Sequence, residues 1–587
     1  MSSRLQRVGD WQLIRQLGQG GFGEVQQWKN LRTNQEIATK HIKNVEHLSP
    51  DQELKLRERW MKEYNWTREF QDLPSIVAGV QLGNDSSEFI RRLNSVHIWQ
   101  LPVIFLEYCN DGDVRKLLQR AQNVNGLVQS EVGDILRCLR QAVDFLHTTC
   151  GICHRDLKPD NIVIHRHGNG RKLYKLTDFG LARNSPDNTQ IQSVVGTRHY
   201  YAPEVVESGK YNSSVDYWSM GVIGFEIATG MLPFIPHQKP INIHLNLRNK
   251  PRNCIAITED LNQNDRFHFH TEIPVEHHLS SHFASKLKEF LSLALDSNYS
   301  RRGIQEATDG VQGESRSPII FTKIDRLLEM KVLTLFVAFK YKRLEYEVTS
   351  AMPMSELAKK IAQDTEMPVN SLYLLLPTGH PHGRVTYDTQ PIDLYVSEWC
   401  DTSEESHSPP VMVYVFNMKH YEYSAPSCCM TNLVQQCINS ENAFPDWVME
   451  RLVLEIHYIL SKERETMRTM LFGFKEYAMT LEHDMLAYQP AIKAVNSEKE
   501  QCYGALTQFD NLFTEAKKLN KLNMVNKTEF ESNVQKLVSK GNEIVSLINQ
   551  TISHYDSSLR NVREEALKQS AEIYKLFVDS DKFKLYV

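Results

Sequence analysis

The stretch His154-Arg155-Asp156-Leu157-Lys158-Pro159-Asp160-Asn161 decides the fold of this chain. Three of its side chains have complementary chemistry. Asp156 can accept a proton from a hydroxyl group, and Lys158 can neutralise a developing negative charge. Asn161 can offer an amide oxygen to a metal ion. A proton acceptor, a cation and a metal ligand within eight residues indicate a catalytic loop.

Two short motifs follow this loop in a fixed order. Asp178-Phe179-Gly180 begins seventeen residues after Asn161, and Asp178 can serve as a second metal ligand. Ala202-Pro203-Glu204 lies further along and closes the segment that starts at Asp178. In the protein kinases that these motifs resemble, Asp216 would hold the backbone of the catalytic loop, and Glu204 and Arg302 would form a structural ion pair.

A glycine-rich loop precedes these motifs near the N-terminus. Gly18-Gln-Gly20-Gly21-Phe-Gly23 has the G-x-G-x-x-G form, which alone fits a dinucleotide fingerprint, a phosphate-covering loop or a plain turn. A dinucleotide fold would need a helix directly after the glycines. Residues 25–28 and 36–42 are instead predicted to be strands, and Lys40 lies on the second of them. This order favours a loop that covers phosphates, because glycine lets the backbone approach them closely.

The ordered motifs together resemble the protein kinase family. The resemblance implies ATP and Mg²⁺ as cofactors, with Asp156 as the proton acceptor, Lys158 beside the transferred phosphoryl group, and Asn161 and Asp178 as metal ligands. It also implies that Lys40 contacts the phosphates and pairs with Glu63, which composition alone does not separate from Glu58 or Glu69. Leu106 falls at the gatekeeper position before the hinge. The implied nucleotide-binding residues are Leu17, Gly18, Gly20, Gly21, Gly23, Val25, Ala38, Lys40, Glu107 and Cys109.

Composition excludes several other classes of protein. The chain has 587 residues, of which 67 are basic and 72 acidic, so its net charge of −5 gives no general attraction to nucleic acid or anionic membrane. Ten cysteines without a repeated spacing favour a reducing compartment. We expect no secretory signal, no membrane span and no nucleic-acid partner, and a location in the cytoplasm with the nucleus as an additional compartment.

The length allows several domains, and the patterns change twice along the chain. Residues 1–330 carry the motifs above. Residues 331–420 read as two strands, a short helix over 355–365 and a further strand over 372–376, an order similar to ubiquitin. Residues 428–587 read as helical, with breaks expected at Pro445 and Pro490. The predicted class is a multidomain α+β protein with a bilobal kinase domain, a ubiquitin-like β-grasp domain and an elongated α-helical scaffold and dimerisation domain.

Further, less specific matches narrow the resemblance to one family of protein kinases. Residues 57–60, 106–109, 193–197, 215–219 and 233–236 look like the inhibitor-of-κB kinase family, of the conventional α/β type, and the order of regions is also similar. The resemblance implies a serine/threonine kinase that phosphorylates IκB-like proteins in NF-κB-type immune signalling. It also implies a homo- or hetero-dimer and a NEMO-like regulatory subunit. The chain ends at Val587 and reads as a shorter or differently assembling member.

The segment between Asp178 and Glu204 carries two hydroxyls four residues apart. Thr189 and Ser193 match the positions at which this family is switched on by phosphorylation, with Arg155 as a partner for the added charge. A helical seam near the C-terminus has heptad-like spacing and fits packing within the chain or a coiled coil. Its positions are Phe530, Val534, Leu537, Gly541, Ile544 and Ile548.

Two other functions remain open from the sequence. A TANK-binding-kinase-like enzyme would have the same three-domain order and a similar run over 175–180. A scaffold protein with a passive kinase domain would use its helical region as the working part. The complete set of Lys40, Asp156, Asn161 and Asp178 favours an active enzyme over the scaffold.

Overall fold

The computed structural model describes most of the chain in two compact units. The described residues are 6–19, 23–42, 49–70, 73–168, 170–179, 183–184, 198–207, 212–260, 266–304, 318–338, 340–376, 385, 388–395, 412–417, 430–439, 444–518 and scattered helical positions between 532 and 564. Gly20, Gly21, Gly180, Thr189, Ser193 and the six seam positions from 530 to 548 lie outside them. Unit 1 contains residues 1–332 and 428–462, and unit 2 contains residues 333–427 and 463–587.

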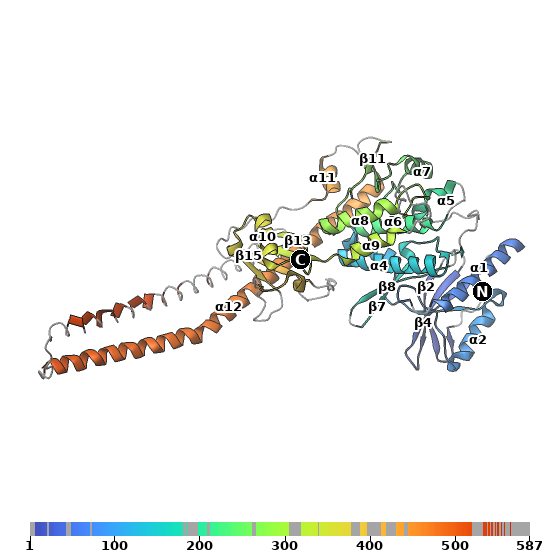
Figure 1. Cartoon of the computed structure of the whole chain (residues 1–587). Helices are drawn as coiled ribbons and strands as arrows, with labels where there is room; N and C mark the ends of the chain where they lie inside the picture. The colour runs from blue at the N-terminus through green and yellow to red at the C-terminus, as the bar shows by residue number, and fades with distance from the viewer. Residues whose placement is uncertain are drawn as a thin grey trace, which may run out of the picture. The chain divides into compact units, whose positions relative to one another are not determined.

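The N-terminal lobe of unit 1 is a five-stranded sheet in sequential order, with the antiparallel pairing of neighbouring strands. Figure 1 shows helices α1 and α2 beside this sheet. Both predicted strands, 25–28 and 36–42, are present in it. The elements are β1 (Arg7–Val8), β2 (Trp11–Gln19), β3 (Gly23–Asn30), β4 (Glu36–Ile42), β5 (Ile104–Glu107), α1 (Pro50–Glu69) and α2 (Ser87–Val96).

Helix α1 has a clear start and one buried face. Ser49 caps it in a capping box with Gln52, and Pro50 occupies the first turn, where its missing N–H costs nothing. The buried residues Leu56, Trp60, Glu63 and Thr67 follow the spacing of one helix face. Glu63 is the acidic member of that face, so it points toward the sheet.

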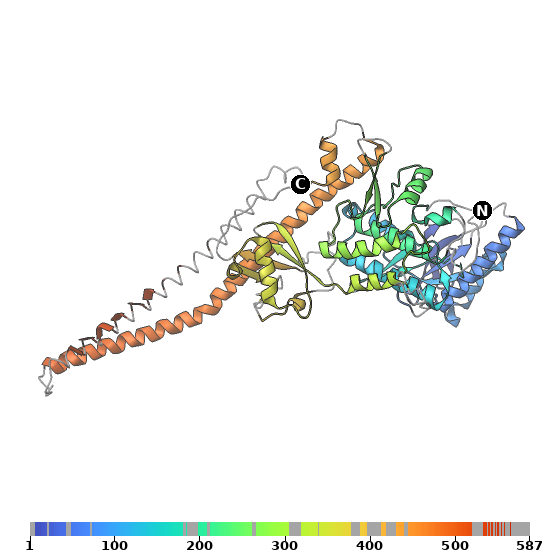
Figure 2. The same cartoon turned by 45° about the horizontal axis from the view of Figure 1, so that its top comes forward.

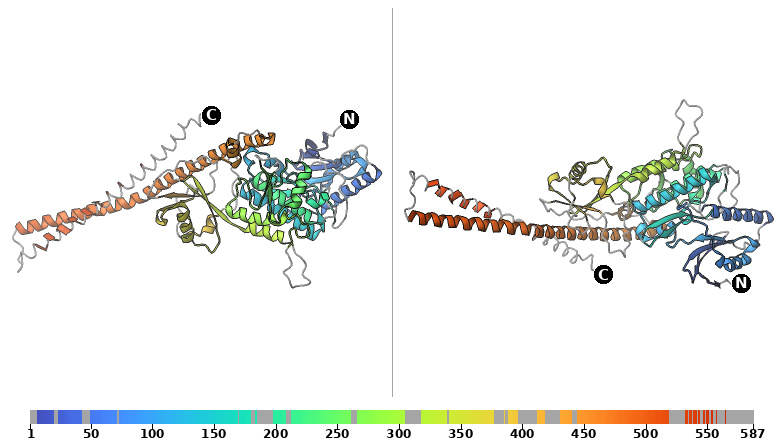
Figure 3. Two further views of the ribbon diagram at one scale, coloured as in Figure 1. Left: turned by 90° about the horizontal axis from the view of Figure 1, so that it is seen from above. Right: turned by 60° about the horizontal axis from the view of Figure 1, so that its bottom comes forward.

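The C-terminal lobe is mainly helical and surrounds α6, in which every residue is buried. Figure 3 shows the two lobes of unit 1 from two further sides. The helices are α3 (Val114–Leu118), α4 (Gln129–Asp144), α5 (Pro203–Glu207), α6 (Ser214–Thr229), α7 (Pro240–Asn249), α8 (Ser281–Ala294) and α9 (Ile319–Glu329). The later segment of unit 1 contains α11 (Asn432–Asn439). The strand pairs are β6 (Ile152–Cys153) with β9 (Arg183–Asn184), β7 (Ile162–Arg166) with β8 (Lys172–Leu176), and β10 (Ala256–Glu259) with β11 (Phe267–His270).

Unit 2 contains a four-stranded sheet in the order β13-β12-β15-β14. The order of strand, strand, helix and strand was predicted for this region. β15 is an additional strand that the amino-acid patterns did not indicate. Alternate residues of β12 are buried on opposite faces of the sheet, with Leu335 against α10 and Phe336 against the unit 2 part of α12. The elements are β12 (Val332–Val337), β13 (Lys342–Glu347), α10 (Met354–Thr365), β14 (Leu372–Leu375) and β15 (Val413–Asn417).

Helix α12 (Asp446–Lys518) runs without interruption, as Figure 2 shows. It begins directly after Pro445, as predicted. The predicted break at Pro490 is wrong, because this proline lies inside the helix. A proline removes one backbone hydrogen bond, and the many turns on either side of Pro490 can hold the helix together across that loss. Within the part of the chain that the structure describes, no helix combines the length and apolar character needed to span a membrane.

Candidate active site

Asp216 on α6 holds the backbone of the catalytic loop. Its Oδ2 accepts a hydrogen bond from the backbone N–H of His154 and its Oδ1 from that of Arg155, each at 2.8 Å. Arg155 has a φ of 69°, a left-handed conformation that costs energy for a side chain other than glycine. The two hydrogen bonds from a fully buried carboxylate fix this strained turn and therefore the position of Asp156.

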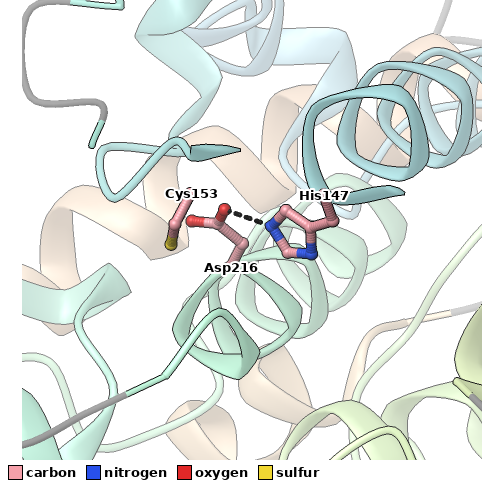
Figure 4. A group of neighbouring side chains, drawn as sticks. All are labelled: His147, Cys153 and Asp216. Carbon is pink, nitrogen blue, oxygen red and sulfur yellow. Dashed lines mark hydrogen bonds and ion pairs between the residues drawn. The ribbon is translucent and has the colours of Figure 1, made fainter. Parts of the chain in front are cut away.

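His147 completes the brace, and Figure 4 shows it beside Asp216 and Cys153. Its Nε2 lies 2.7 Å from Asp216 Oδ2. Burial alone would raise the pKa of Asp216, but the hydrogen bond and charge of His147 together with the loop contacts lower it to about 2. The ligand atoms of this trio lie within 4.8 Å of one another. Both carboxylate oxygens are already occupied, and burial keeps the Cys153 pKa well above its ordinary value, so the group is a brace and not a metal site.

Two side chains of the catalytic loop, Lys158 and Asn161, both contact Asp156. Lys158 Nζ donates to Asp156 Oδ2 at 2.8 Å. The Asn161 amide nitrogen donates to the backbone oxygen of Asp156 at 2.7 Å and to its Oδ2 at 3.1 Å. Because the amide nitrogen is directed at Asp156, the amide oxygen of Asn161 is the atom left for a metal ion. Asn161 thus orients the Asp156 carboxylate and could also offer a ligand.

Lys40 joins the two lobes of unit 1. Its Nζ lies 2.5 Å from Glu63 Oε1 on α1 and 2.8 Å from Asp178 Oδ1. Burial would lower the pKa of Lys40, but the charges of Asp178 and Glu63 outweigh it and raise the pKa above its ordinary value. Burial raises the pKa of Glu63, and the Lys40 charge opposes that rise. Lys40 is therefore a fixed cation between two carboxylates.

Asp178 is turned toward this cation by the backbone and by its neighbour. Its φ is 68°, again left-handed, and its side chain is 44% exposed. Phe179 is buried between Phe70 at the end of α1 and His154 of the catalytic loop, with edge-to-face ring contacts at 5.5 and 5.4 Å. The exposed carboxylate of Asp178 and the amide oxygen of Asn161 are hard ligands of the kind that a divalent ion such as Mg²⁺ prefers.

An apolar cluster lies beside Lys40 and contains five of the residues predicted at the nucleotide site or its gatekeeper. Ala38 pairs with Leu106 across β4 and β5, and Leu17, Val25 and Cys109 pack against the same cluster. Burial and the Glu107 charge raise the pKa of Cys109 to about 12, so its thiol is neutral. Gly18 lies opposite Val25, and Gly23 approaches the His41 carbonyl so closely that a Cβ would lie 2.9 Å from its oxygen.

Sequence reasoning missed several residues of this site. Val163 on β7 joins the apolar cluster from the C-terminal lobe. Lys175 donates to Glu107 Oε1 at 2.6 Å, and that oxygen also accepts from the backbone N–H of Ala78. Glu107 is thus held by side-chain contacts at the end of β5. The available signal for Lys175 was its place in the strand Lys172–Leu176, directly between Tyr174 and Leu176.

The expected scaffold pair is also formed. Arg302 is completely buried, and its guanidinium donates to both carboxylate oxygens of Glu204 at 2.6 and 2.9 Å. This two-point pairing anchors the end of the Asp178–Glu204 segment to the C-terminal lobe.

Comparison with known proteins identifies relatives over much of the chain. Residues 11–309 match the protein kinase domain family. The beta subunit of the inhibitor of nuclear factor kappa-B kinase from Bos taurus is 34% identical over 374 residues, covering 64% of this chain and 46% of the relative. The alpha subunit from Gallus gallus is 27% identical over 477 residues, covering 80% of this chain and 58% of the relative.

A third relative matches a smaller share of the chain. The epsilon subunit from Mus musculus is 28% identical over 299 residues, which is 49% of this chain and 39% of that protein. The chain spans about half the length of the beta subunits that it matches. The alpha-subunit match covers more of the chain than the kinase domain alone. The chain therefore belongs to the protein kinase family, and relatives named as alpha and beta subunits of the inhibitor of nuclear factor kappa-B kinase match 64–80% of it.

Proposed function

We propose that this chain is a serine/threonine protein kinase that transfers the γ-phosphate of ATP to a hydroxyl of an IκB-like protein. The observation that carries the proposal is the assembly of Lys40, Glu63 and Asp178 in one unit with the braced catalytic loop. An ion pair between the strand lysine and the helix glutamate is the arrangement that phosphoryl transfer requires in kinases. A chain retained only as a scaffold has no need of it.

Each side chain has a defined task in this reaction. Asp156 accepts the proton of the attacking hydroxyl, and Asn161 keeps its carboxylate oriented for that task. Lys158 stabilises the charge of the phosphoryl group as it moves. Lys40, fixed by Glu63, holds the phosphates of the nucleotide, and the cluster around Ala38 and Leu106 receives the adenine. Asn161 and Asp178 would hold the divalent metal, which when bound neutralises the phosphate oxygens.

Phosphorylation is the proposed switch of the enzyme. Thr189 and Ser193 lie between Asp178 and Glu204, and each phosphate would add about −1.5 to −2 charges. Arg155, beside the catalytic Asp156, is a suitable partner for that charge. Ser185, which precedes Pro186, is a competing site. The added phosphates would order this segment, and the ordered segment would complete the surface that binds the substrate.

The remaining regions are assigned by the family relationship. The sheet and α10 of unit 2 are proposed to form a ubiquitin-like domain, supported by the strand and helix order. The helical region after residue 428 is proposed to mediate dimerisation and to bind a NEMO-like regulatory subunit. The TANK-binding-kinase-like alternative is weaker, because relatives named as alpha and beta subunits match 64–80% of the chain.

A peptide assay tests the substrate assignment. Purified full chain would be incubated with labelled ATP and Mg²⁺ and with IκB-like peptides that carry paired serines beside acidic residues. We expect label in the serine peptide and in its threonine version, and none in the tyrosine version. Label in the tyrosine peptide alone would overturn the assignment, as would the absence of label in all three.

A further inference from the structure

Four side chains from separate parts of the sequence meet next to the catalytic loop. Arg115 on α3 reaches Glu226 Oε1 on α6 at 2.6 Å and Asp160 Oδ2 at 3.3 Å. It also donates to the hydroxyl of Tyr200, which lies in the short helix Arg198–Tyr200 and itself donates to Glu226. None of these contacts has a part in the phosphoryl-transfer chemistry described above.

The cluster lies beside the loop that carries Asp156, to which a substrate would present its hydroxyl under the proposed function. Asp160 is a member of the catalytic loop, four residues from Asp156, and its side chain is 46% exposed. Tyr201, the neighbour of Tyr200, is close enough to Asp156 for that charge to contribute to its raised pKa, after burial. The cluster is thus bounded on one side by the catalytic loop and on another by the segment that leads to Glu204.

The cluster has the charges of a cation-binding site in which the guanidinium of Arg115 is the bound cation. Two carboxylates, Asp160 and Glu226, converge on one guanidinium, and Glu226 is only 7% exposed beneath it. Burial alone would lower the pKa of Arg115, but Glu226 and then Tyr200 raise it above its ordinary value. Burial and Glu226 raise the pKa of Tyr200, so its hydroxyl keeps its proton. Burial lowers the pKa of His199, and the Glu226 charge opposes that change.

We propose that Arg115 determines substrate specificity by filling, from within the chain, a subsite that would otherwise accept an arginine or lysine of the substrate. Asp160 and Glu226 form that subsite, and Arg115 occupies it in the position that a substrate guanidinium would take. A basic peptide residue at this place meets Arg115 instead of two free carboxylates. Because Arg115 already takes the space and the carboxylate oxygens of the subsite, a basic residue finds no buried counter-charge there, and basic substrates are disfavoured at this position. This inference rests on the proposed kinase function.

The test compares Arg115→Gln with the wild type in the full chain. Gln removes the charge and keeps a polar group near Tyr200. Both proteins would phosphorylate a set of serine peptides in which one arginine is moved through each position around the serine. At one or two positions we expect the ratio of kcat/KM for the arginine peptide over its alanine counterpart to rise about tenfold or more in the variant.

Two controls make the result specific. Lys116→Gln removes a cation from the same helix, but Lys116 is 65% exposed and pairs with Asp113 of its own turn, so the ratio should not change. The double variant Arg115→Gln with Glu226→Gln should lose most of the gain, because the subsite then lacks its buried carboxylate. An equal gain in Lys116→Gln, or an undiminished gain in the double variant, would contradict the proposal.

A further variant keeps Arg115, so the proposal can still be tested if Arg115→Gln does not fold. Asp160→Asn alters a half-exposed side chain and frees part of the Arg115 charge, so peptides with an acidic residue at the same position should gain at least about threefold. Wild-type protein that phosphorylates no peptide would defeat the proposed function itself. Active wild type with unchanged ratios in Arg115→Gln and in Asp160→Asn would defeat the specificity assignment alone, as would a wild type that already prefers arginine there.

Discussion

Lys40 and Glu63 form an ion pair, at 2.5 Å, that ties strand β4 to helix α1. Both side chains are almost completely buried, and the ammonium also contacts Asp178. The pair places a fixed positive charge beside the carboxylate that follows β8. The position of α1 therefore controls where the Lys40 ammonium lies.

Glu63→Gln should lower kcat/KM by about 100-fold, because a loosely held Lys40 no longer positions the phosphates. Glu58→Gln is the matched control, since Glu58 lies on the same helix but is exposed. Steady-state kinetics on the serine peptide, with ATP varied, would measure both variants. Equal activity of the Glu63 variant and the control would contradict the role of the pair.

Asp216 gives a prediction about stability in acid. Its pKa in the folded chain is about 2, below its ordinary value of 3.8, so the charged form is favoured by folding. A lowered pKa contributes stability that is complete above pH 3.8 and is lost as the pH falls toward 2. Asp216→Asn should therefore remove about 2 kcal/mol near neutral pH and less near pH 2.

Calorimetric scans of the wild type and of Asp216→Asn between pH 7 and pH 2 would test this. The difference between the two unfolding temperatures should shrink as the pH falls below 4. A difference that is constant across the range would show that the charge of Asp216 contributes nothing to the brace.

The buried pair of Glu204 and Arg302 predicts a larger loss of stability. Glu204→Gln leaves a fully buried guanidinium without its counter-charge, and such losses cost about 3–5 kcal/mol. Arg301→Met is the control, because Arg301 is adjacent, 41% exposed and paired with Asp296, so its loss should cost below about 1 kcal/mol. Thermal unfolding of both variants measures the difference, and losses of similar size would argue against the anchoring role.

Thr189→Ala combined with Ser193→Ala should prevent activation of the enzyme in stimulated cells. The hydroxyls accept the phosphates, so their loss removes the charge that would order the segment. Kinase activity immunoprecipitated before and after stimulation is the measurement. Normal activation of the double variant would place the switch elsewhere, with Ser185 as the next position to replace.

The motifs in the sequence predicted which residues would gather at the site, and the structure brings Lys40, Asp156, Asn161 and Asp178 into one unit. Glu63 could not be separated from Glu58 and Glu69 by composition, but it alone of the three lies on the buried face of α1. That face is visible in the spacing of Leu56, Trp60 and Thr67. Helical periodicity read with the acidic residues would have made the choice from the sequence.

Other features depend on contacts that no local pattern reports. Arg115 and Glu226 are 111 residues apart and neither belongs to a motif, so their meeting beside Asp160 follows only from the packing of α3 on the catalytic loop and of the loop on α6. The prediction of a helix break at Pro490 was wrong for a related reason. A proline predicts a break from its own turn, whereas the rest of α12 decides whether the helix continues.

Asp156 is proposed to accept the proton of the attacking hydroxyl, and Asp156→Asn removes that ability. Asn occupies the same volume and can keep the contact with Lys158, but it cannot take up the hydroxyl proton. The measurement is transfer of labelled phosphate to the IκB-like serine peptide by purified wild type and variant, with thermal unfolding of both. We expect loss of transfer with an unchanged unfolding temperature. Transfer by the pure variant at the wild-type rate would contradict this expectation.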